Sequence, residues 1–175
     1  FNQFIQRYGL SPAENGGEPE ELTEGACQME LVADPTRLEQ LLTLWQNAPW
    51  VSVLTLPDLQ GVAVDGVEED EGSSGAVILP DRVGADAYRH CLEVLFSDKV
   101  TKVTHQVKEL AEDLLAEGLP IEGFRFDTAL GAYLLAPTDG SYAMEKLSVK
   151  WLGFELPPAQ TFLAEDAFPP LEEPT

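Results

Sequence analysis

The sequence predicts an α/β domain in which helices flank a mixed β-sheet. Short runs rich in β-branched and apolar residues recur between residues 27 and 104, and segments with helical apolar spacing separate and follow them. Glycine and proline punctuate the helix ends. Hydrophobic residues make up 44% of the chain, an ordinary share for a globular core. Strands followed by alternating strands and helices are typical of an α/β architecture.

Composition divides the 175 residues into three parts. Residues 1–24 start with apolar residues at helical spacing and continue into a stretch rich in Gly, Pro and Glu, which predicts the end of an upstream helix and a linker. Residues 25–155 contain the predicted domain. Residues 156–175 are acidic and proline-rich and predict an extended tail or an insertion. The chain begins Phe-Asn-Gln without Met, which indicates a fragment of a longer protein.

The first half of the domain predicts four strands and two helices. The strands are expected at residues 27–32, 50–56, 61–64 and 76–79, with the acidic loop 68–71 joining the last two. The first helix begins with Asp34 as N-cap and Pro35 at its first position, and the second covers residues 84–96. Their apolar stripes consist of Leu38, Leu41, Leu42 and Trp45, and of Tyr88, Cys91, Leu92 and Leu95.

The second half predicts a strand at residues 99–104 and three further helices. The first of these helices ends at Gly118 and Pro120. Asp127 is expected to cap the second, which Pro137 stops, and Ser141 or Tyr142 opens the third, which ends at Gly153. The side chains expected to face inward are Val107, Leu110, Ala111, Leu114 and Leu115 on the first helix and Met144, Leu147 and Trp151 on the third.

The charge of the chain limits what it can bind. Ten basic and 31 acidic residues give a net charge of −21, which repels a phosphate backbone and argues against a stand-alone nucleic-acid-binding protein.

Cys27 and Cys91 each lie in an apolar run, which favours buried thiols and a cytoplasmic protein over a disulfide. The two histidines, His90 and His105, are too few for a histidine metal site and are expected to be surface or capping residues. No apolar run is long enough to cross a membrane.

Five short motifs between residues 102 and 153 occur in an uncommon order. They read Lys-Val-Thr-His-Gln-Val-Lys-Glu-Leu (102–110), Phe-Asp-Thr (126–128), Ala-Tyr-Leu-Leu (132–135), Tyr-Ala-Met-Glu-Lys-Leu (142–147) and Trp-Leu-Gly (151–153). This order resembles the 3′→5′ exonuclease (proofreading) domain of bacterial family A DNA polymerases, the polymerase I type. The resemblance implies a ribonuclease H-like fold. The segment before these motifs matches only in the order of its elements.

The resemblance also implies metal ligands that this chain lacks. Members of the family use carboxylates to hold two divalent ions, which activate a water and stabilise the leaving oxygen. The Asp-x-Glu motif of the first sheet strand falls on Leu54 and Leu56, and the Asn-x-x-x-Asp motif falls on Gln106 and Leu110. Apolar side chains supply no ligand to a hard cation such as magnesium. We therefore predict no catalytic residue and no metal or other cofactor for this domain.

The third family motif, Tyr-x-x-x-Asp, has a weak counterpart in residues 162–166, which end at Asp166 but begin with Phe. The true third motif could also lie beyond Thr175. An alternative interpretation is an active metal-dependent exonuclease whose ligands have moved to Glu109, Asp127 and Asp166. Helix capping explains Asp127 more simply, because the neighbouring ligand positions are apolar.

The resemblance implies a vestigial, inactive exonuclease domain that supports a bacterial DNA polymerase I. Its partner would be the polymerase domain of the same chain, which extends DNA with magnesium, and it would meet DNA only through that parent enzyme. Leucines at the former ligand positions predict that apolar packing fills the old cleft. Weak DNA contacts are expected at Lys102, Gln106 and Lys108. A third interpretation is an acidic protein-binding module of the same fold.

Overall fold

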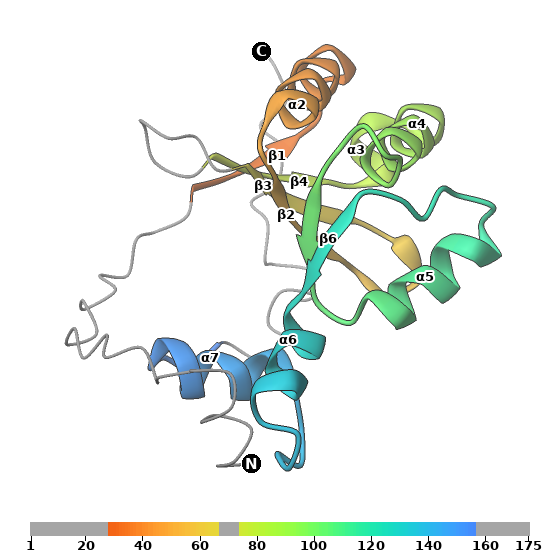
Figure 1. Cartoon of the computed structure of the whole chain (residues 1–175). Coiled ribbons are helices and arrows are strands. Elements are labelled where there is room, and N and C mark those ends of the chain that lie inside the picture. The colour runs from red at the N-terminus through yellow and green to blue at the C-terminus, as the bar shows by residue number, and fades with distance from the viewer. Residues whose placement is uncertain (1–27, 67–73, 157–175) are drawn as a thin grey trace.

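The computed structural model describes residues 28–66 and 74–156. Its elements, in chain order, are β1 (Gln28–Val32), α2 (Pro35–Asn47), β2 (Val51–Thr55), the 3₁₀ turn η1 (Pro57–Leu59), β3 (Val62–Gly66), β4 (Ser74–Ile78), α3 (Pro80–Val83), α4 (Ala85–Leu95), β5 (Lys102–Thr104), α5 (Val107–Ala116), β6 (Phe124–Asp127), α6 (Thr128–Leu135) and α7 (Met144–Leu152) (Figure 1). The predicted upstream helix, linker, acidic loop and tail, together with Cys27 and Asp166, lie outside the described residues.

The strands form one six-stranded sheet in the order β1-β4-β3-β2-β5-β6. The pairs β2–β3 and β3–β4 are antiparallel, whereas β1–β4, β2–β5 and β5–β6 are parallel. The sheet is therefore mixed, and the predicted α/β class is confirmed. The β2–β5 pair places Val51 opposite Lys102, so residues far apart in the sequence meet in the middle of the sheet.

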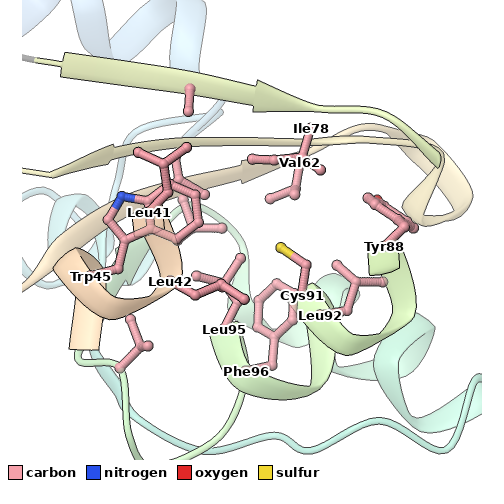
Figure 2. Close-up of a cluster of buried hydrophobic side chains, with 14 of the residues drawn as sticks. Leu41, Leu42, Trp45, Val62, Ile78, Tyr88, Cys91, Leu92, Leu95 and Phe96 are labelled. Atoms are coloured by element: carbon pink, nitrogen blue, oxygen red, sulfur yellow. The ribbon is translucent and has the colours of Figure 1, made fainter. Parts of the chain in front are cut away.

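Helices α2 and α4 cover one face of the sheet. The main core lies between these helices and the sheet. Figure 2 shows side chains of α2 (Leu41, Leu42 and Trp45) and of α4 pointing toward Val62 and Ile78 of the sheet. On β2, Val51 and Val53 face this core, while Ser52 and Leu54 point to the opposite face. Strand β2 is therefore buried on one face only, as alternation in a strand dictates.

The predicted helix starts and stops are largely confirmed. Asp34 caps α2 by accepting a hydrogen bond from the Thr36 N–H (2.9 Å). Asp127 caps α6, and the helix α7 ends at Gly153 in the left-handed conformation (φ 78°). The structure adds three elements that the sequence interpretation missed: the 3₁₀ turn η1, the short helix α3 and the edge strand β6. Helix α7 starts at Met144, later than predicted.

Two side chains predicted to face inward are exposed instead. Trp151 on α7 is 55% exposed and Leu115 on α5 is 66% exposed. On α5 the buried residues are Leu110 and Leu114, so its apolar stripe is narrower than the sequence pattern indicated. On α7 the buried residue is Ser148, whose single hydroxyl proton can be donated to the carbonyl oxygen of Phe154 (2.9 Å) or of Glu145 (3.1 Å). The inner side of this helix therefore carries a polar contact.

Helices α6 and α7 lie on the other side of the sheet from α2, α3 and α4 (Figure 1). Helix α6 follows β6 without a loop, because Asp127 ends the strand in extended conformation and caps the helix that starts at Thr128. This direct connection brings the start of α6 close to the outer face of β2 and β5, where the candidate site lies.

Candidate functional site

Asp127 is the most heavily used carboxylate in the described residues. Its Oδ1 accepts hydrogen bonds from the N–H groups of Ala129 (2.8 Å) and Leu130 (3.3 Å) at the start of α6. The same carboxylate accepts from Gln106 (3.1 Å) and Val107 (2.9 Å) at the start of α5. One side chain therefore caps two helices whose first N–H groups have no partner within the helix.

These hydrogen bonds also fix the charge of Asp127. Partial burial favours the neutral carboxyl and would raise its pKa, but the N–H donors of Val107, Leu130, Ala129 and Gln106 favour the anion and lower the pKa below its usual value. A carboxylate held by four backbone donors has little lone-pair capacity left for a metal ion. The geometry therefore supports the capping interpretation of Asp127.

A pocket of about 270 Å³ opens on the outer face of the sheet, next to this double cap. It is bordered by β1–β3 and β5, by Thr128 at the start of α6 and by Met144 at the start of α7. Leu54 projects into it from β2, together with Ser52, and is 49% exposed. Polar groups on its wall come from Asp65, Thr104, His105 and Thr128.

His105 was expected to be a surface or capping residue, but it is half-buried in the wall of this pocket. Its Nδ1 lies 2.8 Å from the hydroxyl of Thr128, which also lies 3.4 Å from the Thr104 carbonyl oxygen. Its Nε2 is buried and has no hydrogen-bond partner among the described residues. Burial lowers the pKa of His105, although Asp127, Glu145 and Glu109 oppose this effect, so the neutral imidazole is favoured.

The structure does not gather the four degenerate motif positions into one pocket. Leu54 lines the pocket, whereas Leu56, Gln106 and Leu110 do not. Leu110 is 5% exposed and belongs to the main core, so apolar packing does fill this position. At Leu54 the side chain stays half exposed, and the prediction that packing fills the old cleft fails there.

The three residues expected to contact DNA differ in exposure. Lys102 has no exposed surface: its Nζ donates to the carbonyl oxygens of Ser97 (3.2 Å), Val100 (2.8 Å) and Glu122 (2.5 Å). Burial lowers the pKa of Lys102 to about 8, against the opposing charges of Glu122 and Asp98. This placement does not fit the predicted DNA contact, because all three donors already face carbonyl oxygens.

Gln106 and Lys108 are exposed at the start of α5. Gln106 has a left-handed backbone (φ 56°), a conformation that non-glycine residues adopt at some cost and that often marks a constrained turn. Here the constraint is the hydrogen bond from its N–H to Asp127. The contacts with DNA expected at Gln106 and Lys108 remain predictions.

The described residues contain no group of three or more His, Cys, Asp or Glu side chains arranged to hold a metal ion. Glu109, proposed as a relocated ligand, is exposed on α5, and Asp127 is engaged by the double cap. The third proposed ligand, Asp166, lies outside the described residues. Within residues 28–66 and 74–156, no helix is long and apolar enough to span a membrane.

The chain is similar in sequence to bacterial DNA polymerases over part of its length. It is 40% identical over 55 residues to DNA polymerase I of Mycobacterium bovis and of Mycobacterium tuberculosis. The matched segment covers 31% of this chain and only 6% of each relative. No protein-family model matches the chain.

Solved structures of exonucleases and of a polymerase share its fold. The POL domain of Pol1 from M. smegmatis, in complex with DNA primer-template and dNTP, has a TM-score of 0.59 at 24% identity, covering 74% of this chain and 23% of that one. The catalytic core of RRP6 from Trypanosoma brucei has a TM-score of 0.59 at 17% identity, covering 98% and 49%. Escherichia coli RNase D has a TM-score of 0.56 at 16% identity, covering 83% and 39%. The chain therefore has the ribonuclease H-like 3′–5′ exonuclease fold, as the motif order predicted.

Proposed function

We propose that this chain, which has the 3′–5′ exonuclease fold and a segment similar to mycobacterial DNA polymerase I, is a non-catalytic exonuclease-type domain of such a polymerase. The observation that carries the proposal is the placement of leucine at former ligand positions. The resemblance of the motifs implies a ligand carboxylate at Leu54, which lines the outer pocket, and another at Leu110, which is buried in the core. Neither side chain can coordinate a divalent cation.

The chemistry of phosphodiester hydrolysis explains why these losses matter. Two divalent ions must be held close together by oxygen ligands so that one activates water and the other stabilises the leaving oxygen. Around the pocket the available polar groups are hydroxyls, Asp65 and a histidine whose neutral form is favoured. One carboxylate beside hydroxyls is a weak site for magnesium, which binds few protein ligands even in dedicated sites.

The proposed role is structural support of the parent enzyme. In this proposal the domain packs against the polymerase domain of the same cytoplasmic protein. That polymerase domain synthesises DNA with magnesium, and this domain meets DNA only through the complex. The net charge of −21 supports the last point, because an isolated domain with this charge is repelled by a phosphate backbone. The relocated-ligand and protein-binding alternatives gain no specific support from the geometry.

A nuclease assay tests the proposal directly. The chain is incubated with 5′-labelled single-stranded DNA and either magnesium or manganese, beside an active exonuclease of the same fold. We expect no shortening of the label with either metal. We also expect none from the double variant Leu54→Asp, Leu56→Glu, because Leu110 still supplies no ligand on α5.

Metal-dependent shortening that persists through a final purification step would contradict the proposal. The variants Glu109→Gln and Asp166→Asn would then show whether relocated carboxylates carry the activity. Cleavage gained only in the double variant would show that the remaining residues still form a metal site.

A further inference from the structure

His105 lies where the sheet meets the starts of α5, α6 and α7. It follows β5 directly and is separated from α5 by Gln106 alone. Its Nδ1 lies 2.8 Å from the hydroxyl of Thr128, the first residue of α6. Met144, the first residue of α7, lines the outer pocket together with His105 and Thr128. A change of charge on this one ring therefore acts at the place where α6 and α7 approach the sheet.

The hydrogen bonds available to His105 suit the neutral imidazole and not the imidazolium. With a neutral ring, the Thr128 hydroxyl can either donate to Nδ1 or accept from it. The imidazolium carries an N–H on both nitrogens, and Nε2 is buried without a hydrogen-bond partner among the described residues. Protonation therefore leaves a buried, charged donor with no acceptor, which is costly unless water or a carboxylate reaches it.

The charges around His105 do not remove this cost. Burial is the largest effect and lowers the pKa of His105 below its ordinary value of 6.5, against the opposing charges of Asp127, Glu145 and Glu109. Asp127 is held by its backbone donors at the starts of α5 and α6. Glu145 on α7 and Glu109 on α5 are exposed, where solvent screens them. Asp65 of β3 lines the same pocket.

We propose that His105 is a pH-sensitive contact that holds the starts of α6 and α7 against the sheet while its ring is neutral. Protonation of the ring opens this contact and admits water to Nε2. Histidine suits the role because its charge changes between about pH 5 and 8. The proposal does not depend on the absence of nuclease activity.

Thermodynamic linkage fixes the direction of the effect. The pKa of His105 is lower in the closed fold than in the open or unfolded chain, because burial disfavours the charged ring. Its contribution to closure is therefore fully present above pH 6.5 and is lost as the pH falls through the folded pKa. Mild acid should loosen α6 and α7 while the main core between α2, α4 and the sheet stays closed.

Hydrogen–deuterium exchange of the full chain tests the proposal. Exchange at about pH 7.5 and about pH 5.5 is compared after correction for the intrinsic pH dependence of amide exchange. We expect the corrected rates of Thr128–Leu135 and Met144–Leu152 to rise at the lower pH, and those of Pro35–Asn47 to stay unchanged. His105→Asn keeps a polar group close to the ring position but takes up no proton, so it should lose the rise.

The one other histidine of the chain provides the matched control. His90 is exposed on α4, with its Nε2 3.7 Å from the carboxylate of Glu39. His90→Asn should keep the full rise in exchange, because His105 is then the only histidine left. A rise that persists in His105→Asn, one that disappears in His90→Asn, or none in the wild type would overturn the proposal.

Nuclear magnetic resonance adds a test that leaves His105 in place. In His90→Asn the only histidine ring signals belong to His105, and we expect them to titrate with a midpoint below 6.5. Amide signals of α6 and α7 should change with the same midpoint. A ring midpoint at or above 6.5, or helix signals that do not follow the ring, would overturn the proposal even if His105→Asn fails to fold.

Discussion

At the scale of single residues, Asp127 joins two helices through one carboxylate. Its hydrogen bonds to the starts of α5 and α6 predict a larger loss on substitution than a single cap gives. Replacing one cap residue by alanine typically costs about 1 kcal/mol. We therefore expect Asp127→Ala to lower the free energy of unfolding by about 2 kcal/mol, and Asp34→Ala, which removes only the cap of α2, by about 1 kcal/mol. Urea denaturation at pH 7 measures both.

The same comparison carries a pH dependence with a definite sign. The folded pKa of Asp127 lies below its unfolded value of about 3.8, so its contribution is fully present above that value and is lost as pH falls through the folded pKa. The difference in stability between wild type and Asp127→Ala should therefore shrink below about pH 4. A constant difference down to pH 2, or equal losses in the two variants at pH 7, would contradict the double-cap interpretation.

Residue-scale prediction from sequence succeeded where the contact is local. The cap of α6 was predictable because Asp127 lies next to the helix it caps. Its second role was not, because the N–H groups of Gln106 and Val107 are about twenty residues away in the chain. The predicted DNA contact of Lys102 does not fit the structure for the same reason. Lysines are mostly exposed, and only the fold brings the carbonyl groups of Ser97, Val100 and Glu122 around its ammonium group.

At the scale of elements, the former ligand position on β2 is half exposed, whereas the one on α5 is buried. Leu54 is half exposed on the outer face of β2, whereas Leu110 is buried on the inner face of α5. We expect Leu54→Asp to change the free energy of unfolding by less than about 1 kcal/mol. Leu110→Asp loses a packed side chain and buries a charge, so it should cost at least about 3 kcal/mol. Denaturation of both variants, with Leu110→Asn as an uncharged control, measures the contrast.

Similar losses for Leu54→Asp and Leu110→Asp would show that the outer pocket is packed as tightly as the core. That result would remove the contrast in packing between the two positions. A much smaller loss for Leu110→Asp would instead indicate that α5 can turn this position toward solvent, where a carboxylate could serve as a ligand.

Element positions were predictable where apolar periodicity is strong, as on α2 and α4. The edge strand β6 was missed because it has only four residues and merges directly into α6. The inward prediction for Trp151 followed helical spacing, but spacing alone does not say whether another element covers that side. Trp151 instead lines an open groove and stays 55% exposed. The dispersal of Leu54, Gln106 and Leu110 likewise depends on three-dimensional packing that motif spacing does not contain.

At the scale of the whole molecule, the net charge of −21 sets how stability responds to salt. Like charges repel each other in the compact state. Added salt shortens the distance over which this repulsion acts and so weakens it. Attractive surface pairs such as Arg37–Glu30 (2.9 Å) are weakened by salt at the same time, but each contributes little. We therefore expect the free energy of unfolding to rise between low and physiological NaCl concentration, as measured by urea denaturation.

Two variants on the exposed side of α5 isolate the role of net charge. Lys108→Glu makes the chain more negative and Glu112→Lys makes it less negative, yet both replace one member of the same pair of positions four residues apart. Repulsion predicts that salt stabilises Lys108→Glu more than wild type and Glu112→Lys less. If stability instead falls with salt, or if the two variants respond alike, specific ion pairs rather than overall repulsion govern the electrostatics of the fold.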